Sequence, residues 1–278
     1  MNLADLVHLA PGVDHALRGY MTLISICSLR MAIILVLLPP LDASVLQPLI
    51  RSGLTLMFSF YIAYGQPATL IDDLSGLQLL GLACREAVIG LVLGFAASSV
   101  FWMAQGAGTL IDDLTGYNNV QIANPNNPVT FTPTAFLFAQ IASAVFWILG
   151  GMRSLLGVVY ESYHWWPLGA QTPVAANILE SFAIAQTETL MTGVLKLSAP
   201  IMLILLLVDV GFGMIARAAP RLDLISLTQP VKAAVMVMVL AQFVVLFIEN
   251  LRGELTLVHL PDKLHAMVGT LAASGASP

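Results

Sequence analysis

The apolar residues of this chain occur in six long runs that are separated by short polar breaks. A helix that crosses lipid needs about 20 apolar residues to span about 30 Å of hydrocarbon. Only the first and fifth runs reach that length comfortably, and the second reaches it only if its helix extends back through Arg51. Backbone in lipid must satisfy its own hydrogen bonds and no strand-like alternation is present, so we predict helices, several of them packed mainly against protein. The runs are 20–38, 54–64, 88–104, 135–151, 197–219 and 233–248.

Composition agrees with a membrane environment. The 278 residues are 58% hydrophobic and only 10% charged, and the mean hydropathy is +0.87. A soluble domain carries roughly a quarter charged residues. We therefore predict an all-α integral membrane protein, most of whose surface faces lipid or other apolar protein.

Charge and motifs exclude several classes of function. The net charge is −5 and the eleven basic residues are spread singly, so no nucleic-acid partner is expected. The sequence has no zinc-peptidase motif, no serine nucleophile elbow, no nucleotide-binding loop and no metal-ligand spacing among its histidines. We expect no enzyme activity, no cofactor and no metal. Cys27 and Cys84 lie in apolar runs and are expected to be small buried hydrophobic residues.

The longest polar break covers residues 112–133 and is rich in asparagine and proline. These residue types favour turns and loops over helix. A structureless loop of this length in a compact protein is usually functional or disordered. We expect an irregular loop across the whole break.

An eight-residue segment occurs twice. Residues 69–76 (Thr-Leu-Ile-Asp-Asp-Leu-Ser-Gly) return almost unchanged as residues 109–116. An aspartyl-protease pair is a poor explanation, because both copies lie in polar breaks where nothing forces the carboxylates to be desolvated. The copies are either two polar helix boundaries, which we favour, or two acidic patches outside the membrane.

Three charged residues, Arg30, Lys196 and Asp209, lie within or beside apolar runs. A charge at the bilayer centre costs at least about 2.5–3.5 kcal/mol, so such residues are candidates for function. They could form the relay of an ion-coupled transporter, or they could make structural contacts or extend to the interface. Because no partner lies four residues away, the structural reading is favoured.

Gly90, Gly94 and Ser98 form a stripe of small residues with helical spacing. Such a stripe lets a second helix approach closely, either within the chain or from another subunit. In both cases we expect this helix to be a centre of packing.

The last two apolar runs are joined by residues 209–232, which we expect to form a hairpin. Its turn carries the densest basic group in the chain, which by the positive-inside rule places it on the cytoplasmic side. Two prolines are expected to fix the ends of the turn. The turn residues are Arg217, Pro220, Arg221, Pro230 and Lys232.

This hairpin carries a resemblance to a known family. The sequence Leu-Leu-Leu-Val-Asp-Val-Gly-Phe-Gly at 205–213, followed by Arg-Ala-Ala-Pro-Arg-Leu-Asp at 217–223 and Leu-Thr-Gln-Pro-Val-Lys at 227–232, resembles the C-terminal hairpin of type III secretion export-gate proteins, the SctT/FliR family. Residues 85–112 and 147–169 also resemble family segments. The phrase around Gln105 is closer to the injectisome branch than to the flagellar branch.

The resemblance implies a subunit of the export gate in the bacterial inner membrane, a multi-pass protein at the base of the secretion apparatus. Residues 1–174 would resemble the SctR/FliP partner, residues 175–255 would form a kinked hairpin resembling SctS/FliQ, and residues 256–278 would be a polar tail. The implied partners are SctR-type and SctS-type gate subunits, an SctU-type switch protein at the cytoplasmic entrance, an SctV-type export component, unfolded exported proteins and membrane lipid.

The resemblance also implies that this subunit forms part of a protein-conducting channel and supplies its closed-state plug. The break 112–133 matches the plug loop by position. Buried Arg30 and Asp209 would then find partners on other subunits. The alternative from the residues alone is an ion- or solute-coupled secondary transporter that uses the three intramembrane charges. The implied plug residues are Asp112, Asp113, Asn118, Asn119, Asn124, Pro125, Asn126, Asn127, Pro128 and Phe131.

Overall fold

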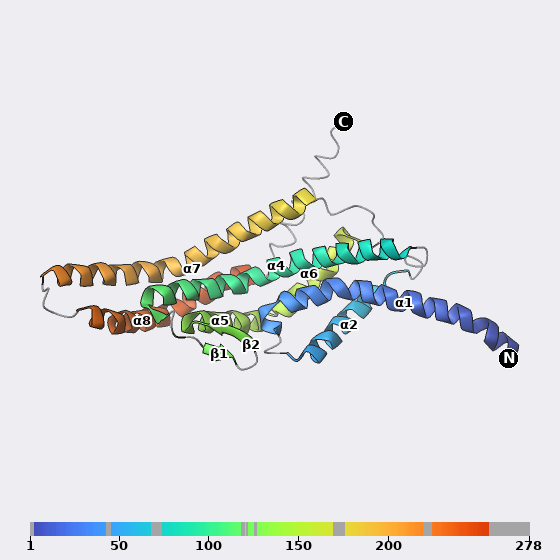
Figure 1. Ribbon diagram of the computed structural model, residues 1–278, viewed down its shortest axis with the longest axis horizontal. Coiled ribbons are helices and arrows are strands. Elements are labelled where there is room, and N and C mark those ends of the chain that lie inside the picture. The colour runs from blue at the N-terminus through green and yellow to red at the C-terminus, as the bar shows by residue number, and fades with distance from the viewer. Residues whose placement is uncertain are drawn as a thin grey trace, which may run out of the picture. The chain divides into compact units, whose positions relative to one another are not determined.

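In a computed structural model the described part of the chain is almost entirely helical (Figure 1). The structure describes residues 3–42, 46–67, 74–117, 120, 122–124, 127–168, 176–218 and 224–255. Its elements are α1 (Leu3–Leu37), the short 3-10 helix η1 (Pro39–Leu41), α2 (Pro48–Tyr64), α4 (Gly76–Thr115), β1 (Ile122–Asn124), β2 (Asn127–Phe131), α5 (Pro133–Ile148), α6 (Gly151–Trp165), α7 (Ala176–Ala218) and α8 (Leu224–Leu255).

Among the described residues, four helices are long and apolar enough to cross a membrane, namely Leu17–Leu37, Gly76–Thr115, Phe182–Ala218 and Leu227–Arg252. Helices α5 and α6 together could form a fifth span, bent by 73°. The predicted all-α integral membrane class is therefore confirmed. The most apolar stretch of α4 is 67% buried, against 11% for α7 and 17% for α8, so α4 is the most enclosed of the four.

Prolines set several helix ends as the sequence suggests. Leu38 is extended because it precedes a proline, and α1 therefore ends at Leu37. Pro48 and Pro133 occupy the first turns of α2 and α5, where a missing N–H costs nothing. Helix α2 does extend back through Arg51.

The chain divides into two compact units that alternate along the sequence. The first unit is residues 1–97 with 156–180, and the second is residues 98–155 with 181–278. Helix α4 contributes its first half to one unit and its second half to the other. The predicted division into an SctR-like part and an SctS-like hairpin stays a prediction.

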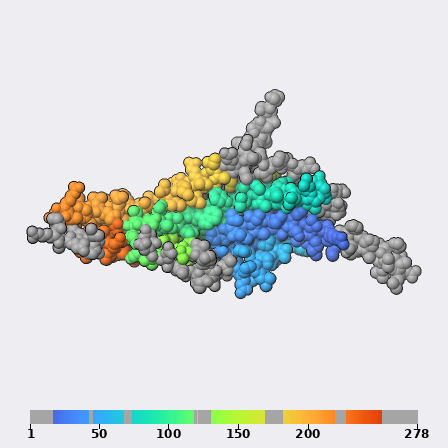
Figure 2. Space-filling view, in the orientation of Figure 1, coloured from blue at the N-terminus to red at the C-terminus, as the bar shows by residue number. Residues whose placement is uncertain are grey.

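In the first unit, α1 packs against α2 and α4. Figure 2 shows α2 lying directly against α1. Several large apolar side chains of α2 are exposed, including Leu49 and Met57. A Cβ atom on Gly90 would lie 2.9 Å from the carbonyl oxygen of Arg30, and one on Gly94 would lie 3.2 Å from the Cα of Ile34. A Cβ at Gly90 would force a shift of the backbone, and one at Gly94 would require its neighbours to move by a few tenths of an ångström, so the two glycines let α4 lie close against α1.

In the second unit, aromatic rings and another glycine hold α4, α5 and α8 together. The rings of Phe138 and Phe247 stack with centroids 4.1 Å apart, and Phe101 meets Phe146 edge-on at 5.5 Å. A Cβ on Gly108 would lie 2.5 Å from the backbone of Ala135, so α4 touches the start of α5.

The described residues of the polar break 112–133 contain more regular structure than the sequence predicts. Asp112 and Asp113 lie in the last turn of α4 rather than in a loop. Strands β1 and β2 then pair antiparallel, with Ile122 opposite Phe131 and Asn124 opposite Asn127. Val, Thr and Phe in residues 129–131 favour strand, and the asparagines fall at the hairpin end, so local propensity explains the difference.

Two smaller expectations also change. Pro230 is the seventh residue of α8 and does not end the hairpin turn. Pro200 likewise lies inside a helix, because α7 continues through it. Membrane helices tolerate interior proline because neighbouring groups can satisfy the freed carbonyl. Cys27 is buried as predicted, whereas Cys84 is exposed, so that expectation is wrong for Cys84.

Candidate functional site

The two ends of the segment that joins α4 to α5 form the first polar centre. We call these ends the loop roots: residues 112–116 at the end of α4, and residues 132–135 at the start of α5. Helix α4 stops at Gly116, whose φ of +83° is a left-handed conformation that favours glycine. Each loop root includes the end of a helix, where some backbone N–H or C=O groups have no hydrogen-bond partner within their own helix.

Asp112 accepts hydrogen bonds from the free backbone N–H groups of the loop root on α5. Its carboxylate is fully buried, and the backbone N–H and hydroxyl of Thr134 donate to its two oxygens at 2.8 Å and 2.6 Å. The N–H of Ala135 donates more weakly, at 3.4 Å. Thr132, at the N-cap position of α5, makes no side-chain cap. A carboxylate from α4 therefore caps α5 across 22 residues of sequence, where the helix dipole favours negative charge.

Lys232 donates a hydrogen bond to a backbone carbonyl of the loop root on α4. Its ammonium donates to the carbonyl oxygen of Leu114 at 3.0 Å and pairs with Asp209 at 2.5 Å. Leu114 is in the last turn of α4, where carbonyls lack helical partners and a cation complements the dipole. The resemblance implied a partner for Asp209 on another subunit, but its partner lies in the same chain.

Gln229 lies one turn before Lys232 on α8. Its side-chain amide occupies the space that a Cβ on Gly116 would need, so it packs directly on the glycine that ends α4. Residues three apart share one helix face. One face of α8 thus makes two contacts with the end of α4: the amide of Gln229 packs on Gly116, and the ammonium of Lys232 binds the carbonyl of Leu114.

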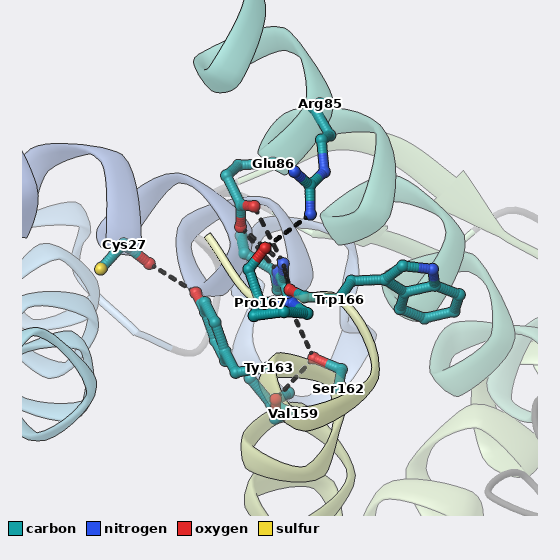
Figure 3. A network of polar contacts seen from close by, with 9 residues as sticks. Cys27, Arg85, Glu86, Val159, Ser162, Tyr163, Trp166 and Pro167 are labelled. Carbon is teal, nitrogen blue, oxygen red and sulfur yellow. Dashed lines mark hydrogen bonds and ion pairs between the residues drawn. The ribbon is translucent and has the colours of Figure 1, made fainter. Parts of the chain in front are cut away.

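The second polar centre lies in the first unit and surrounds Arg30 of α1 (Figure 3). The guanidinium is fully buried and makes four hydrogen bonds. Two go to the carboxylate of Glu86 on α4, at 2.8 and 3.0 Å. The others go to the hydroxyl of Ser162 at 2.8 Å and the carbonyl of Trp166 at 3.3 Å. This bidentate geometry is the strongest form of arginine–carboxylate pairing.

Aromatic and backbone contacts complete this centre. Arg30 lies over the ring of Tyr163, 3.8 Å from its centroid, and the tyrosine hydroxyl donates to the carbonyl of Cys27 at 3.0 Å. Figure 3 shows Arg85 reaching the carbonyl of Pro167, a contact of 2.8 Å. The network ties α1, α4 and α6 together. Sequence reasoning found Arg30 but missed Glu86, although an acidic residue beside a long apolar run was a usable sign.

The other predicted residues have different surroundings. Lys196, Arg217 and Asp113 are exposed, Phe131 is partly exposed, and Ser98 is buried. Among the described residues, no cluster of histidine, cysteine or acidic side chains could hold a metal ion. For some plug residues only the backbone is described, namely Asn124, Asn127 and Pro128. The predicted residues outside the described part of the chain are Asn118, Asn119, Pro125, Asn126, Pro220 and Arg221.

The first copy of the repeated segment also lies largely outside the described residues, since 68–73 are not described. In the second copy, Asp112 turns inward to cap α5 while Asp113 faces outward. That copy is a helix boundary, as favoured from the sequence.

Several long apolar helices, with the Arg30–Glu86 ion pair fully buried among them, define a multi-pass α-helical membrane protein. The model of the family "Bacterial export proteins, family 1" matches residues 21–257, and the chain belongs to that family. The predicted membership of the SctT/FliR family is thereby confirmed.

Named relatives agree with this assignment. The chain is 27% identical over 233 residues to "Yop proteins translocation protein T" of Yersinia pestis, covering 82% of this chain and 88% of the relative. It is 28% identical to "Secretion system apparatus protein SsaT" of Salmonella typhimurium, covering 72% and 82%. It is 25% identical to "Flagellar biosynthetic protein FliR" of Escherichia coli, covering 74% and 79%. The secretion-system relatives favour the injectisome branch.

Proposed function

We propose that this protein is a subunit of the export gate of a type III secretion apparatus in the bacterial inner membrane. In this role it forms part of the protein-conducting channel, and the segment between the two loop roots closes that channel. Membership of a family of bacterial export proteins and the secretion-apparatus names of its relatives support the general role. The protein acts as a conduit component, and the energy for export comes from other components.

The observation that carries the plug assignment is the double capping of the loop roots. A closing segment must return to one position after each opening, which requires fixed ends and a tip with few packed contacts. Asp112 and Lys232 fix the ends through charged contacts to helix termini. The intervening β1–β2 hairpin is a two-stranded sheet, which alone is only marginally stable in water. The two described ends of the segment are thus anchored, and the β1–β2 pair between them adds little stability of its own.

The partners in this proposal are SctR-type and SctS-type gate subunits, an SctU-type switch protein and an SctV-type export component. The outer faces of α7 and α8 support such an assembly. Large apolar side chains there are well exposed, including Leu207 at 61%, Met214 at 69% and Met238 at 65%. They require cover from lipid or from apolar protein.

The solute-coupled transporter is less well supported. A transport relay needs ionisable groups that are free to exchange partners. Arg30 makes four hydrogen bonds to protein groups, and Asp209 is paired with Lys232. Lys196 is exposed, so these three charges do not form a pathway with one another.

The test is deletion of residues 124–128, which shortens the hairpin between its two fixed roots. In membranes that carry the assembled gate, we expect the deletion to make the gate permeable to small ions. Co-purification of the partner subunits is the control for assembly. An assembled gate that stays as tight as the wild type would refute the plug assignment.

A further inference from the structure

We propose that Lys232 is a positioning residue through which the α7–α8 hairpin holds the closing segment in its closed place. This inference rests on the proposed function, because it concerns what keeps the plug shut. The three relevant contacts all lie in the second unit of the molecule and involve the end of α4.

The first step of the argument is the place of the contact. Lys232 binds the carbonyl of Leu114, two residues before Gly116, where α4 stops and the closing segment begins. Helix ends fray unless their last carbonyls are satisfied. The position of this loop root is therefore set partly by a side chain that belongs to α8.

The second step is the environment of the ammonium. Lys232 is 8% exposed, and besides the neutral carbonyl of Leu114 it has a charged partner, Asp209 on α7. A buried ammonium that loses one acceptor leaves a costly unsatisfied charge, so the three groups hold their geometry together. The ammonium thus links α4, α7 and α8 at one point.

The third step is the direction of coupling. Gln229 and Lys232 both hold α4 from one face of α8. A partner protein that shifts the α7–α8 hairpin would withdraw both side chains from the end of α4. The last turn of α4 would loosen, and the closing segment would lose one of its two fixed roots while Asp112 keeps the other.

The experiment measures small-ion flux in membrane vesicles that contain the whole assembled gate. Lys232→Met removes the charge but keeps most of the stem, and we expect about a tenfold rise in flux because a charged hydrogen bond is lost. Lys232→Arg keeps a cation at this position, and its small-ion flux should stay close to that of the wild type. Lys196→Met, an exposed lysine of α7, is the matched control and should leave flux unchanged.

Combination with the 124–128 deletion separates this inference from the proposed function. If Lys232 acts through the closing segment, Lys232→Met should add nothing to the flux of the deletion. A tight Lys232→Met gate beside a leaky deletion would overturn the inference and leave the plug assignment intact. A leak that adds to that of the deletion would also overturn it, because Lys232 would then act elsewhere. A tight deletion would instead refute the plug assignment itself.

Gln229→Ala keeps the experiment decisive if Lys232→Met fails to assemble. Gln229 is exposed, so its loss should not prevent folding, yet it removes the second contact of α8 with the end of α4. We expect a smaller rise in flux, again abolished in the deletion background. Wild-type flux in an assembled Gln229→Ala gate would contradict the inference.

Discussion

A guanidinium that is wholly enclosed by protein is stable only with a counter-charge and enough acceptors. Glu86 provides the charge for Arg30, and Ser162 and Trp166 provide further acceptors. Such a pair does not guarantee net stability, since both ions lose their hydration. Its role here is geometric, because it fixes where α1 and α4 cross and how α6 approaches them.

Glu86→Ala should destabilise the protein strongly. It leaves Arg30 buried without its carboxylate, which typically costs about 3–5 kcal/mol. We expect a large drop in the amount of the folded subunit in membranes, and Arg30→Met combined with Glu86→Leu should recover part of it. Glu161→Ala, an exposed acidic residue of α6, is the control. Equal losses in the two single variants would show that the pair has no special role.

Sequence reasoning could predict Arg30 as important but not the identity of its partner. The cost of charge in an apolar run is a local property, and it is visible in residues 20–38 alone. The partner lies 56 residues away in sequence and becomes a partner only when α4 packs on α1. For the same reason the sequence indicates Asp209 as an intramembrane charge and Lys232 as a turn residue, and does not indicate that the two form a pair.

At the level of single elements, glycines decide which helices can touch. Gly94 faces the backbone of Ile34, and even a Cβ there would require its neighbours to move by a few tenths of an ångström, so a larger side chain is expected to push α4 away from α1. Gly94→Asp adds both bulk and a buried charge, and we expect it to abolish assembly with the partner subunits. Gly81→Asp is the matched control in the same helix, because nothing lies within 4 Å of a Cβ at that position. Co-purification of the partners measures the result, and normal recovery with Gly94→Asp would contradict the packing role.

The start of α5 offers a second test at this level. Asp112→Ala removes the cap from three donors, and lost caps typically cost about 0.5–2 kcal/mol. We expect faster hydrogen exchange of the amides in the first turn of α5, measured in the assembled gate. Asp113→Ala changes the exposed neighbour and should leave exchange unchanged. Unchanged exchange in both variants would mean that Asp112 does not hold this loop root.

The break 112–133 shows why element boundaries were harder to predict than helices. Asparagine and proline correctly indicated a departure from helix, but they could not show that α4 continues to Thr115. That extension depends on Asp112, whose carboxylate is satisfied by Thr134 on another helix, and on Lys232 from α8. Long-range capping of this kind leaves no periodic pattern in the sequence.

For the whole molecule, hydrophobicity predicted the class of fold but not the arrangement of its units. The apolar runs gave the helices and the multi-pass character, because both follow from composition and length. The two compact units alternate along the chain, with α4 shared between them, and no linker or change in composition marks their boundary at residues 97–98. Such a boundary depends on contacts between distant segments, which one sequence does not reveal.

The exposure of α7 and α8 leads to a prediction for the intact subunit. Only 11% and 17% of their most apolar stretches are buried within the chain, and two long apolar helices that are so little covered by their own protein need other cover. If partner subunits supply it, the subunit extracted alone into mild detergent should elute as a broad, aggregating species. Co-expression with SctR-type and SctS-type proteins should give a single sharp complex by size-exclusion chromatography. A subunit that is monodisperse alone, and that moves a small solute across liposomes, would instead favour the transporter.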